Sequence, residues 1–256
     1  MSSAEELRAL VESYLGELAL TPELGRQAES VRYSIEVGGK RVRPVICLAT
    51  AEAAGGGAEA ALPAAAALEL VHTFSLVHDD LPALDDDEER RGHPSTWKRY
   101  GEAVGILAGD ALLAEAFRLA LSYPTPAVAR ELAQATLGMI GGQYLDITGT
   151  APDLASLHRL KTGCLFAASV GLALWAVELP EREQARWREF GAELGLLFQV
   201  VDDILDQDGY VLERGAEGAR TLADEAAERA RAALAGVDAD TSVLEGIVDD
   251  LAVRTS

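Results

Sequence analysis

Alanine and leucine recur at three- and four-residue intervals along almost the whole chain, the spacing that places apolar side chains on one face of a helix. The apolar/polar alternation of half-buried strands is scarce. At 256 residues, 49% of them hydrophobic, the chain is long enough to bury one large core. The sequence therefore predicts an all-α protein, a single domain over residues 1–256 with about ten or more helices.

Glycine and proline divide this pattern into separate helices. Thr21 is expected to cap the second helix, with Pro22 at its first position. The Gly55–Gly57 loop is expected to separate the third helix from the fourth. The expected helices cover residues 4–19, 21–38, 40–54, 59–80, 102–121, 126–147, 153–175, 181–206, 217–235 and 241–253.

Composition excludes several classes of function. The formal charge of −20 argues against nucleic-acid binding, which needs a basic surface. Cys47 and Cys164 lie far apart in apolar runs, which favours reduced thiols over a disulfide. The first residues are acidic and polar, unlike a signal peptide, and no apolar run reaches membrane-spanning length free of charge. We expect a soluble cytoplasmic protein without membrane insertion.

Residues 72–97 carry an unusual concentration of charge. An apolar helical run ends at Asp79 and Asp80, a second acidic group begins at Asp85, and Arg90 and Arg91 follow. Carboxylates at a helix C-terminus are unfavourable because that end already carries partial negative charge, so a bound cation is expected there. Hard divalent cations prefer oxygen ligands, and arginines suit a diphosphate bound to those cations.

A second acidic group lies at residues 202–206. Asp202 and Asp206 share a helix face, with Asp203 to one side. A solvated acidic patch is the alternative, but the flanking residues are apolar and look buried, which favours metal binding. Two such groups facing one cavity would hold magnesium ions against a single diphosphate.

Residues 38–44 form a basic turn, Gly-Gly-Lys-Arg-Val-Arg-Pro, with three cations in four residues. The alternative is an ordinary basic surface turn. In so acidic a chain, an anion-binding site at Lys40 and Arg43 is the favoured interpretation.

GGKRVRP, HTFSLVHDDLPALDDDEERRGHPST, GGQYLD, KTG and FQVVDDILD occur in an order and spacing that resemble the trans-isoprenyl diphosphate synthases, most of all the bacterial farnesyl and geranylgeranyl diphosphate synthases. The resemblance covers residues 25 to 206. It implies an isoprenoid-synthase-type helical bundle around a central cavity. It also implies a homodimer that uses Mg²⁺, about three ions per active site, to condense isopentenyl diphosphate head-to-tail (1'-4) with an allylic diphosphate.

The resemblance also assigns roles to single residues. It implies metal binding by both aspartate groups and by a seventh aspartate near the metals: Asp79, Asp80, Asp85, Asp202, Asp203, Asp206 and Asp146. It implies an isopentenyl diphosphate pocket of Gly39, Lys40, Arg43, His72 and Arg91. It implies that Arg90 grips the allylic diphosphate, that Lys161 and Thr162 lie over the allylic group, and that Gln143 and Gln199 line the cavity. The catalytic set is then Asp79, Asp85, Arg90, Lys161, Thr162 and Asp202.

Some of these residues have plainer interpretations. His72 lies among apolar residues, where a histidine is commonly a satisfied core residue, and Gln143 is able to satisfy a buried backbone group. Gly141 and Gly142 allow close helix packing without any role in binding.

Phe74 is expected to limit the length of the product. Phe74 and Ser75 lie about one helical turn before Asp79, where bulk closes the floor of the elongation pocket in the resembled family. An aromatic side chain there favours a farnesyl product, and a geranylgeranyl diphosphate synthase is the alternative.

The sequence departs from the family after Asp206. The family continues through a loop with a glycine–lysine pair, but here no lysine follows Lys161. Arg214 or Arg220 are the available replacements, although an arginine fork is not equivalent to a lysine. Arg254, near the C-terminus, is a candidate to cover the isopentenyl diphosphate pocket. A non-catalytic synthase subunit and a class I terpene cyclase remain as alternatives. Intact aspartate groups argue against the first, and the isopentenyl diphosphate pocket argues against the second.

Overall fold

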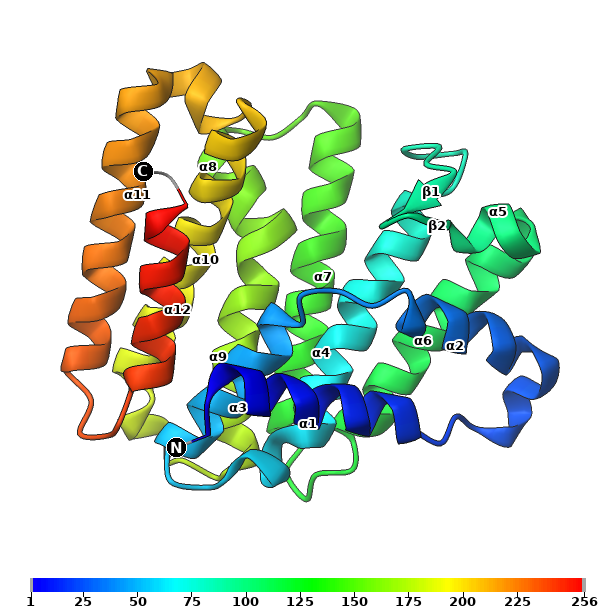
Figure 1. The fold of residues 1–256 in the computed structure, drawn as a ribbon, viewed down its shortest axis with the longest axis horizontal. Helices are drawn as coiled ribbons and strands as arrows, with labels where there is room; N and C mark the ends of the chain where they lie inside the picture. Colours follow the sequence, from blue (N-terminus) through cyan, green and yellow to red (C-terminus); the bar gives the residue numbers. More distant parts are fainter. Residues whose placement is uncertain (1, 255–256) are drawn as a thin grey trace.

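The computed structural model describes residues 2–254, and these residues are almost entirely helical, which confirms the predicted fold class (Figure 1). Its elements are α1 (Ala4–Glu17), η1 (Pro22–Gln27), α2 (Ala28–Glu36), α3 (Val42–Ala53), α4 (Ala58–Asp79), β1 (Glu89–Arg90), β2 (His93–Pro94), α5 (Thr96–Tyr100), α6 (Glu102–Ala120), α7 (Ala127–Thr148), α8 (Leu154–His158), η2 (Arg159–Gly163), α9 (Cys164–Ala176), η3 (Glu181–Glu183), α10 (Ala185–Asp206), α11 (Tyr210–Ala235) and α12 (Ser242–Val253).

Four of the expected helices differ from the observed ones. The second is divided into η1 and α2, with a kink inside η1 at the non-helical Gly25 (φ 49°, ψ −125°), and the Thr21 side chain makes no cap hydrogen bond. The helix expected over 181–206 is divided into the short η3 and the long α10. The helix expected over 153–175 is interrupted by the π-helical turn η2. The helix expected over 217–235 begins seven residues earlier, at Tyr210, and kinks at Gly215. The short β1–β2 hairpin and α5 were not predicted.

Helix α4 is the centre of the core. Its alanine-rich faces are buried against α3, α6 and α9, because small side chains let neighbouring helices approach closely. By length and composition α4 would pass for a membrane span, but 67% of that stretch is buried inside the fold, as in the core helix of a soluble protein. Cys47 is buried in the core, and both cysteines are free thiols.

The candidate site lies where three long helices end together. Helices α4, α7 and α10 all run upward in Figure 1, so Asp79, Asp146 and Asp206 reach the same end of the bundle. Helix α11 returns antiparallel against α10, and α1 lies across α3 and α4. The chain therefore brings both aspartate groups to one end of the fold, as the sequence predicts.

Candidate active site

Two cavities at this end share the side chains of Lys161 and Thr162. One has a volume of about 530 Å³ and is mostly apolar. The other, of about 440 Å³, is mostly polar and acidic. The apolar cavity is lined among others by Arg43, His72, Phe74, Ser75, Asp79, Met139, Gln143 and Leu165, and the acidic cavity by Asp146, His158, Gln199, Asp202, Asp203, Asp206 and Asp208.

The π-helical turn η2 places Lys161 and Thr162 between the cavities. Helix α7 packs directly on this turn at Gly142, where a Cβ atom would overlap the backbone nitrogen and Cα of Lys161. Gly142 is therefore a close packing point, whereas a Cβ at Gly141 would meet nothing within 4 Å. Lys161 Nζ forms an ion pair with Asp146 of α7, so α7 fixes both the backbone and the side chain of this lysine.

In the first aspartate group, one carboxylate lines the apolar cavity and its neighbour is buried within the fold. Asp79 lines the apolar cavity, and partial burial together with the charge of Asp85 raises its pKa to about 6. Asp80 is buried and accepts a hydrogen bond from Arg90 Nε at 2.9 Å. Arg90 also pairs with Asp87 at 3.1 Å, so its guanidinium is already held by two carboxylates.

The second aspartate group divides less sharply, because all three of its carboxylates border the acidic cavity. Asp202 and Asp206 line the acidic cavity, and the pKa of Asp202 is raised by burial and by its acidic neighbours, against the opposing charges of Lys40 and Arg43. Asp203 is buried and accepts hydrogen bonds from Gln199 Nε2 and from the backbone N–H of Tyr210, both at 2.8 Å.

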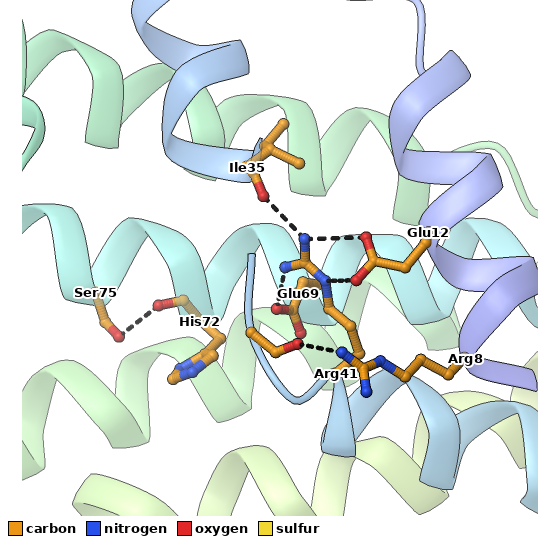
Figure 2. Close-up of polar contacts among 8 residues, drawn as sticks. Arg8, Glu12, Ile35, Arg41, Glu69, His72 and Ser75 are labelled. Atoms are coloured by element: carbon orange, nitrogen blue, oxygen red, sulfur yellow. Dashed lines mark hydrogen bonds and ion pairs between the residues drawn. The ribbon is translucent and has the colours of Figure 1, made fainter. Parts of the chain in front are cut away.

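The basic turn separates its three cations. Arg41 is buried and makes ion pairs with Glu69 at 2.6 Å and with Glu12 at 3.0 Å, so its role is structural (Figure 2). Arg43 lines the apolar cavity with its guanidinium 4.5 Å from the centre of the Phe166 ring, and burial lowers its pKa to about 10. Lys40 is exposed and lines a third cavity, of about 520 Å³, beside the N- and C-terminal helices.

Arg43 lacks an anionic partner. Its Nε is buried with no hydrogen-bond acceptor, and no carboxylate of residues 2–254 forms an ion pair with it. A buried, unpaired donor is costly unless a ligand completes it.

His72 and Gly39 both lie near Arg91. His72 lines the apolar cavity, and burial together with Arg43 and Arg91 lowers its pKa well below the usual value, so the imidazole is neutral. Gly39 lies against the Arg91 guanidinium, whose Nη1 would be 2.8 Å from a Cβ at that position. A side chain at Gly39 would push Arg91 away from the turn.

Other predicted residues are placed differently. Asp85 is exposed on the loop after α4 and lines neither of the two cavities. Arg214 pairs with Glu213 and lies near the Tyr210 ring, outside both cavities. Arg254, the arginine suggested for the isopentenyl diphosphate pocket, lines the third cavity with Lys40.

His158 is a cavity residue that the sequence reasoning did not single out. It lines the acidic cavity, its ring is 5.2 Å from that of Tyr210, and its Nδ1 is 3.9 Å from Asp203 Oδ1. Its position one helical turn before Lys161 was the available signal, because residues three apart share a helix face.

The carboxylates suit a metal ion only in part. All donors are oxygens, as Mg²⁺ prefers. Burial and then repulsion between carboxylates raise the pKa of Asp79 and Asp202, and a cation would relieve both effects. However, no group of three or more His, Cys, Asp or Glu side chains between residues 2 and 254 is gathered closely enough to hold an ion unaided. The arrangement fits ions that also bind oxygens of a ligand.

Comparisons with known proteins agree with this geometry. The polyprenyl synthetase family model matches residues 26–217. The chain is 43% identical over 193 residues to a geranylgeranyl diphosphate synthase of Cyanophora paradoxa, covering 70% of this chain and 64% of that protein. It is 40% identical over 196 residues to a farnesyl diphosphate synthase of Bacillus subtilis, covering 71% and 66%. The chain thus spans less than two thirds of the length of either curated relative.

Solved structures show the same fold over nearly the whole chain. A geranyltransferase of Legionella pneumophila superposes with a TM-score of 0.88 at 29% identity, covering 98% of this chain and 96% of that one. An FPP/GFPP synthase of Zymomonas mobilis superposes with a TM-score of 0.84 at 31% identity, covering 97% and 99%. The fold is thus that of the helical isoprenoid synthases. The chain belongs to the polyprenyl synthetase family.

Proposed function

We propose that this protein is a magnesium-dependent prenyltransferase that condenses isopentenyl diphosphate with an allylic diphosphate to give a short trans-prenyl diphosphate, most simply farnesyl diphosphate. The observation that carries the proposal is the junction at Lys161 and Thr162. There an apolar cavity able to hold a prenyl chain meets an acidic cavity suited to cations and diphosphate. Such a junction suits a reaction that ionises one end of an apolar molecule.

The protein's own groups then have separable tasks. Lys161, Arg43 and Lys40 supply positive charge where the diphosphates lie, and Thr162 presents an oxygen beside the allylic group. Neutral His72 is able to donate or accept a hydrogen bond without adding charge. Magnesium, when bound to Asp79, Asp202 and Asp206 together with substrate oxygens, would neutralise the leaving diphosphate.

The apolar cavity would protect the cationic intermediate. Breaking the allylic C–O bond leaves a carbocation and a diphosphate, and the double bond of isopentenyl diphosphate then forms the new C–C bond as a proton is lost. Water would quench that cation, so walls such as Phe74, Met139 and Leu165 are required. Phe74 is buried in the wall of the cavity, with its ring edge-on to His78 at 5.0 Å, and its bulk beside Asp79 supports a farnesyl rather than a longer product.

A homodimer is part of the proposal. Helices α6 and α7 expose large apolar side chains, among them Leu107, Leu137, Ile140, Tyr144 and Ile147, and the last three also line the apolar cavity. Single exposed hydrophobic residues are normal, but a contiguous set marks an interface. A second copy covering α7 would close this wall of the cavity against water.

The test is incubation with isopentenyl diphosphate, Mg²⁺ and, in turn, dimethylallyl, geranyl or farnesyl diphosphate, with products separated by chromatography and a parallel reaction in EDTA. We expect farnesyl diphosphate from the first two substrates and no product in EDTA. Condensation with farnesyl diphosphate would instead identify a geranylgeranyl synthase. No condensation with any of the three would point to a non-catalytic subunit.

A further inference from the structure

Helix α1 lies outside the segment that matches the family model, yet it contacts the basic turn at two points. Glu12 accepts hydrogen bonds from Arg41 Nε at 3.0 Å and Nη2 at 3.3 Å. Arg8 Nη2 donates to the carbonyl oxygen of Gly39 at 3.3 Å. Figure 2 shows both contacts, with Arg41 between Glu12 and Glu69.

The side-chain contacts of Arg41 fix its backbone conformation. Its backbone is left-handed (φ 51°, ψ 34°), a conformation that is unfavourable for arginine. Its buried guanidinium donates to Glu69 on one side, to Glu12 on another and to the carbonyl oxygen of Ile35 at 2.8 Å. An unfavourable backbone persists only when such surrounding bonds determine it.

The conformation of Arg41 decides where its neighbours lie. Because Arg41 points toward α1 and α4, Lys40 and Arg43 remain to line two separate cavities. Phe198 lines the cavity of Lys40, and its ring centre lies 5.9 Å from the Arg43 guanidinium. The positive charges of Lys40 and Arg43 both oppose the rise in the pKa of Asp202, so both cations lie near this carboxylate of the second aspartate group. A change in the turn would therefore displace two anion-binding groups together.

We propose that Glu12 and Arg8 are positioning residues, which hold the basic turn so that Lys40 and Arg43 grip the diphosphate of isopentenyl diphosphate. The inference rests on the proposed function. Arg8 also adds a third cation to the cavity lined by Lys40 and Arg254, which otherwise contains the acids Glu5 and Asp250.

Glu12 is the better residue to change, because its side chain is 43% exposed whereas that of Glu69 is 4% exposed. Glu12→Gln leaves Arg41 paired with Glu69, so the fold is retained while one charged partner of Arg41 is lost. We expect the KM for isopentenyl diphosphate to rise about fivefold, the equivalent of about 1 kcal/mol, with kcat and the KM for the allylic diphosphate unchanged. Glu17→Gln, an exposed residue on the same helix, is the matched control and should change neither constant.

Arg8 is tested by a pair of variants. Arg8→Gln should raise the same KM by a smaller factor, about twofold to threefold, and Arg8→Lys should restore part of it because lysine retains the charge and the donor. Equal effects of Gln and Lys at this position would contradict the role given to Arg8.

Calorimetric binding separates this inference from the proposed function, because it needs no turnover. Isopentenyl diphosphate and inorganic diphosphate are titrated into wild type, Glu12→Gln and Glu17→Gln, and Kd should weaken about fivefold in Glu12→Gln alone. If wild type binds isopentenyl diphosphate but condenses it with nothing, the function fails while the binding comparison still decides the inference. Equal Kd values in all three proteins, a lower melting temperature without any change in Kd, or no binding by wild type would each overturn the inference.

Discussion

The two aspartate groups have similar arrangements of carboxylates, but the segments that follow them in the chain differ. In each, one carboxylate lines a cavity and its neighbour is buried and hydrogen-bonded within the fold: Asp79 beside Asp80 at the end of α4, and Asp202 beside Asp203, which also borders the acidic cavity, near the end of α10. Asp80 is neutralised by an arginine, whereas Asp203 is satisfied by an amide side chain and a backbone N–H.

The segments that follow explain this difference. After α4 the chain runs through a loop to the β1–β2 hairpin, which returns Arg90 to Asp80 and Arg91 to the basic turn. After α10 only three residues precede α11, and the N-terminal N–H of that helix takes the place of a cation. The positive charge near the second group consequently comes from Lys161, Lys40 and Arg43. Among the described residues, Lys161 is the one lysine or arginine that lines the acidic cavity.

The largest expected effect is loss of activity when a cavity-facing aspartate is neutralised. Asp79→Asn and Asp202→Asn should each lower kcat/KM about 10²- to 10³-fold, because each removes charge placed against the reacting diphosphate. Steady-state rates at several Mg²⁺ concentrations measure this, with exposed Asp238→Asn as the control. Activity of Asp202→Asn within threefold of wild type would show that the second group does not take part in the reaction.

The buried aspartates should respond in stability instead. Asp203→Ala leaves the buried N–H of Tyr210 without its acceptor, so the free energy of unfolding should fall by about 1–3 kcal/mol. Asp206→Ala, an exposed change on the same helix, should alter it by no more than about 0.5 kcal/mol. Urea unfolding measures both, and equal stabilities would contradict a structural role for Asp203.

The sequence predicted the helices and the meeting of the two aspartate groups well, because apolar periodicity determines which faces are buried. It did not reveal which member of each aspartate pair is buried and hydrogen-bonded within the fold. Adjacent helical residues point about 100° apart, and only the rotation of α4 and α10 within the bundle decides which one is buried.

The role of Arg41 shows a similar limit. Three cations in one turn look alike in sequence, and the carboxylates that make Arg41 structural come from positions 12 and 69, far along the chain. The π-helical turn η2 was missed because a one-residue change in helical pitch leaves no mark in apolar spacing. Metal binding by the seven aspartates stays a prediction.

Smaller effects are expected when the phenylalanine about one helical turn before each aspartate group is replaced by alanine, and the two replacements should differ in kind. Phe74→Ala should lengthen the product, since Phe74 lines the apolar cavity and its removal would enlarge the space for a prenyl chain. Phe198→Ala should leave product length unchanged and raise the KM for isopentenyl diphosphate about threefold, because Phe198 packs on Phe166 beside Arg43. Chromatography and initial rates distinguish the two. An unchanged product from Phe74→Ala would refute the chain-length role, and a longer product from Phe198→Ala would break the comparison.

The smallest effect concerns pH. The pKa of Asp79 is raised from 3.8 to about 6, so between about pH 4 and pH 6 the folded protein retains a proton that the unfolded chain has lost. This contribution is present at low pH and is lost as pH rises through the folded pKa, and Asp202 shifts in the same direction.

Other acids, such as Asp153, shift the opposite way, so the comparison must be between wild type and Asp79→Asn. In EDTA, the variant should melt above wild type at pH 7.5 by a few degrees, and this advantage should shrink by pH 5, where the wild-type carboxyl is largely protonated. Mg²⁺ with diphosphate should reduce the difference at pH 7.5, because bound cations remove the repulsion in wild type. Asp202→Asn should likewise raise the melting temperature at pH 7.5 in EDTA. A constant difference in melting temperature across this pH range would mean that neither carboxylate is destabilised by its surroundings.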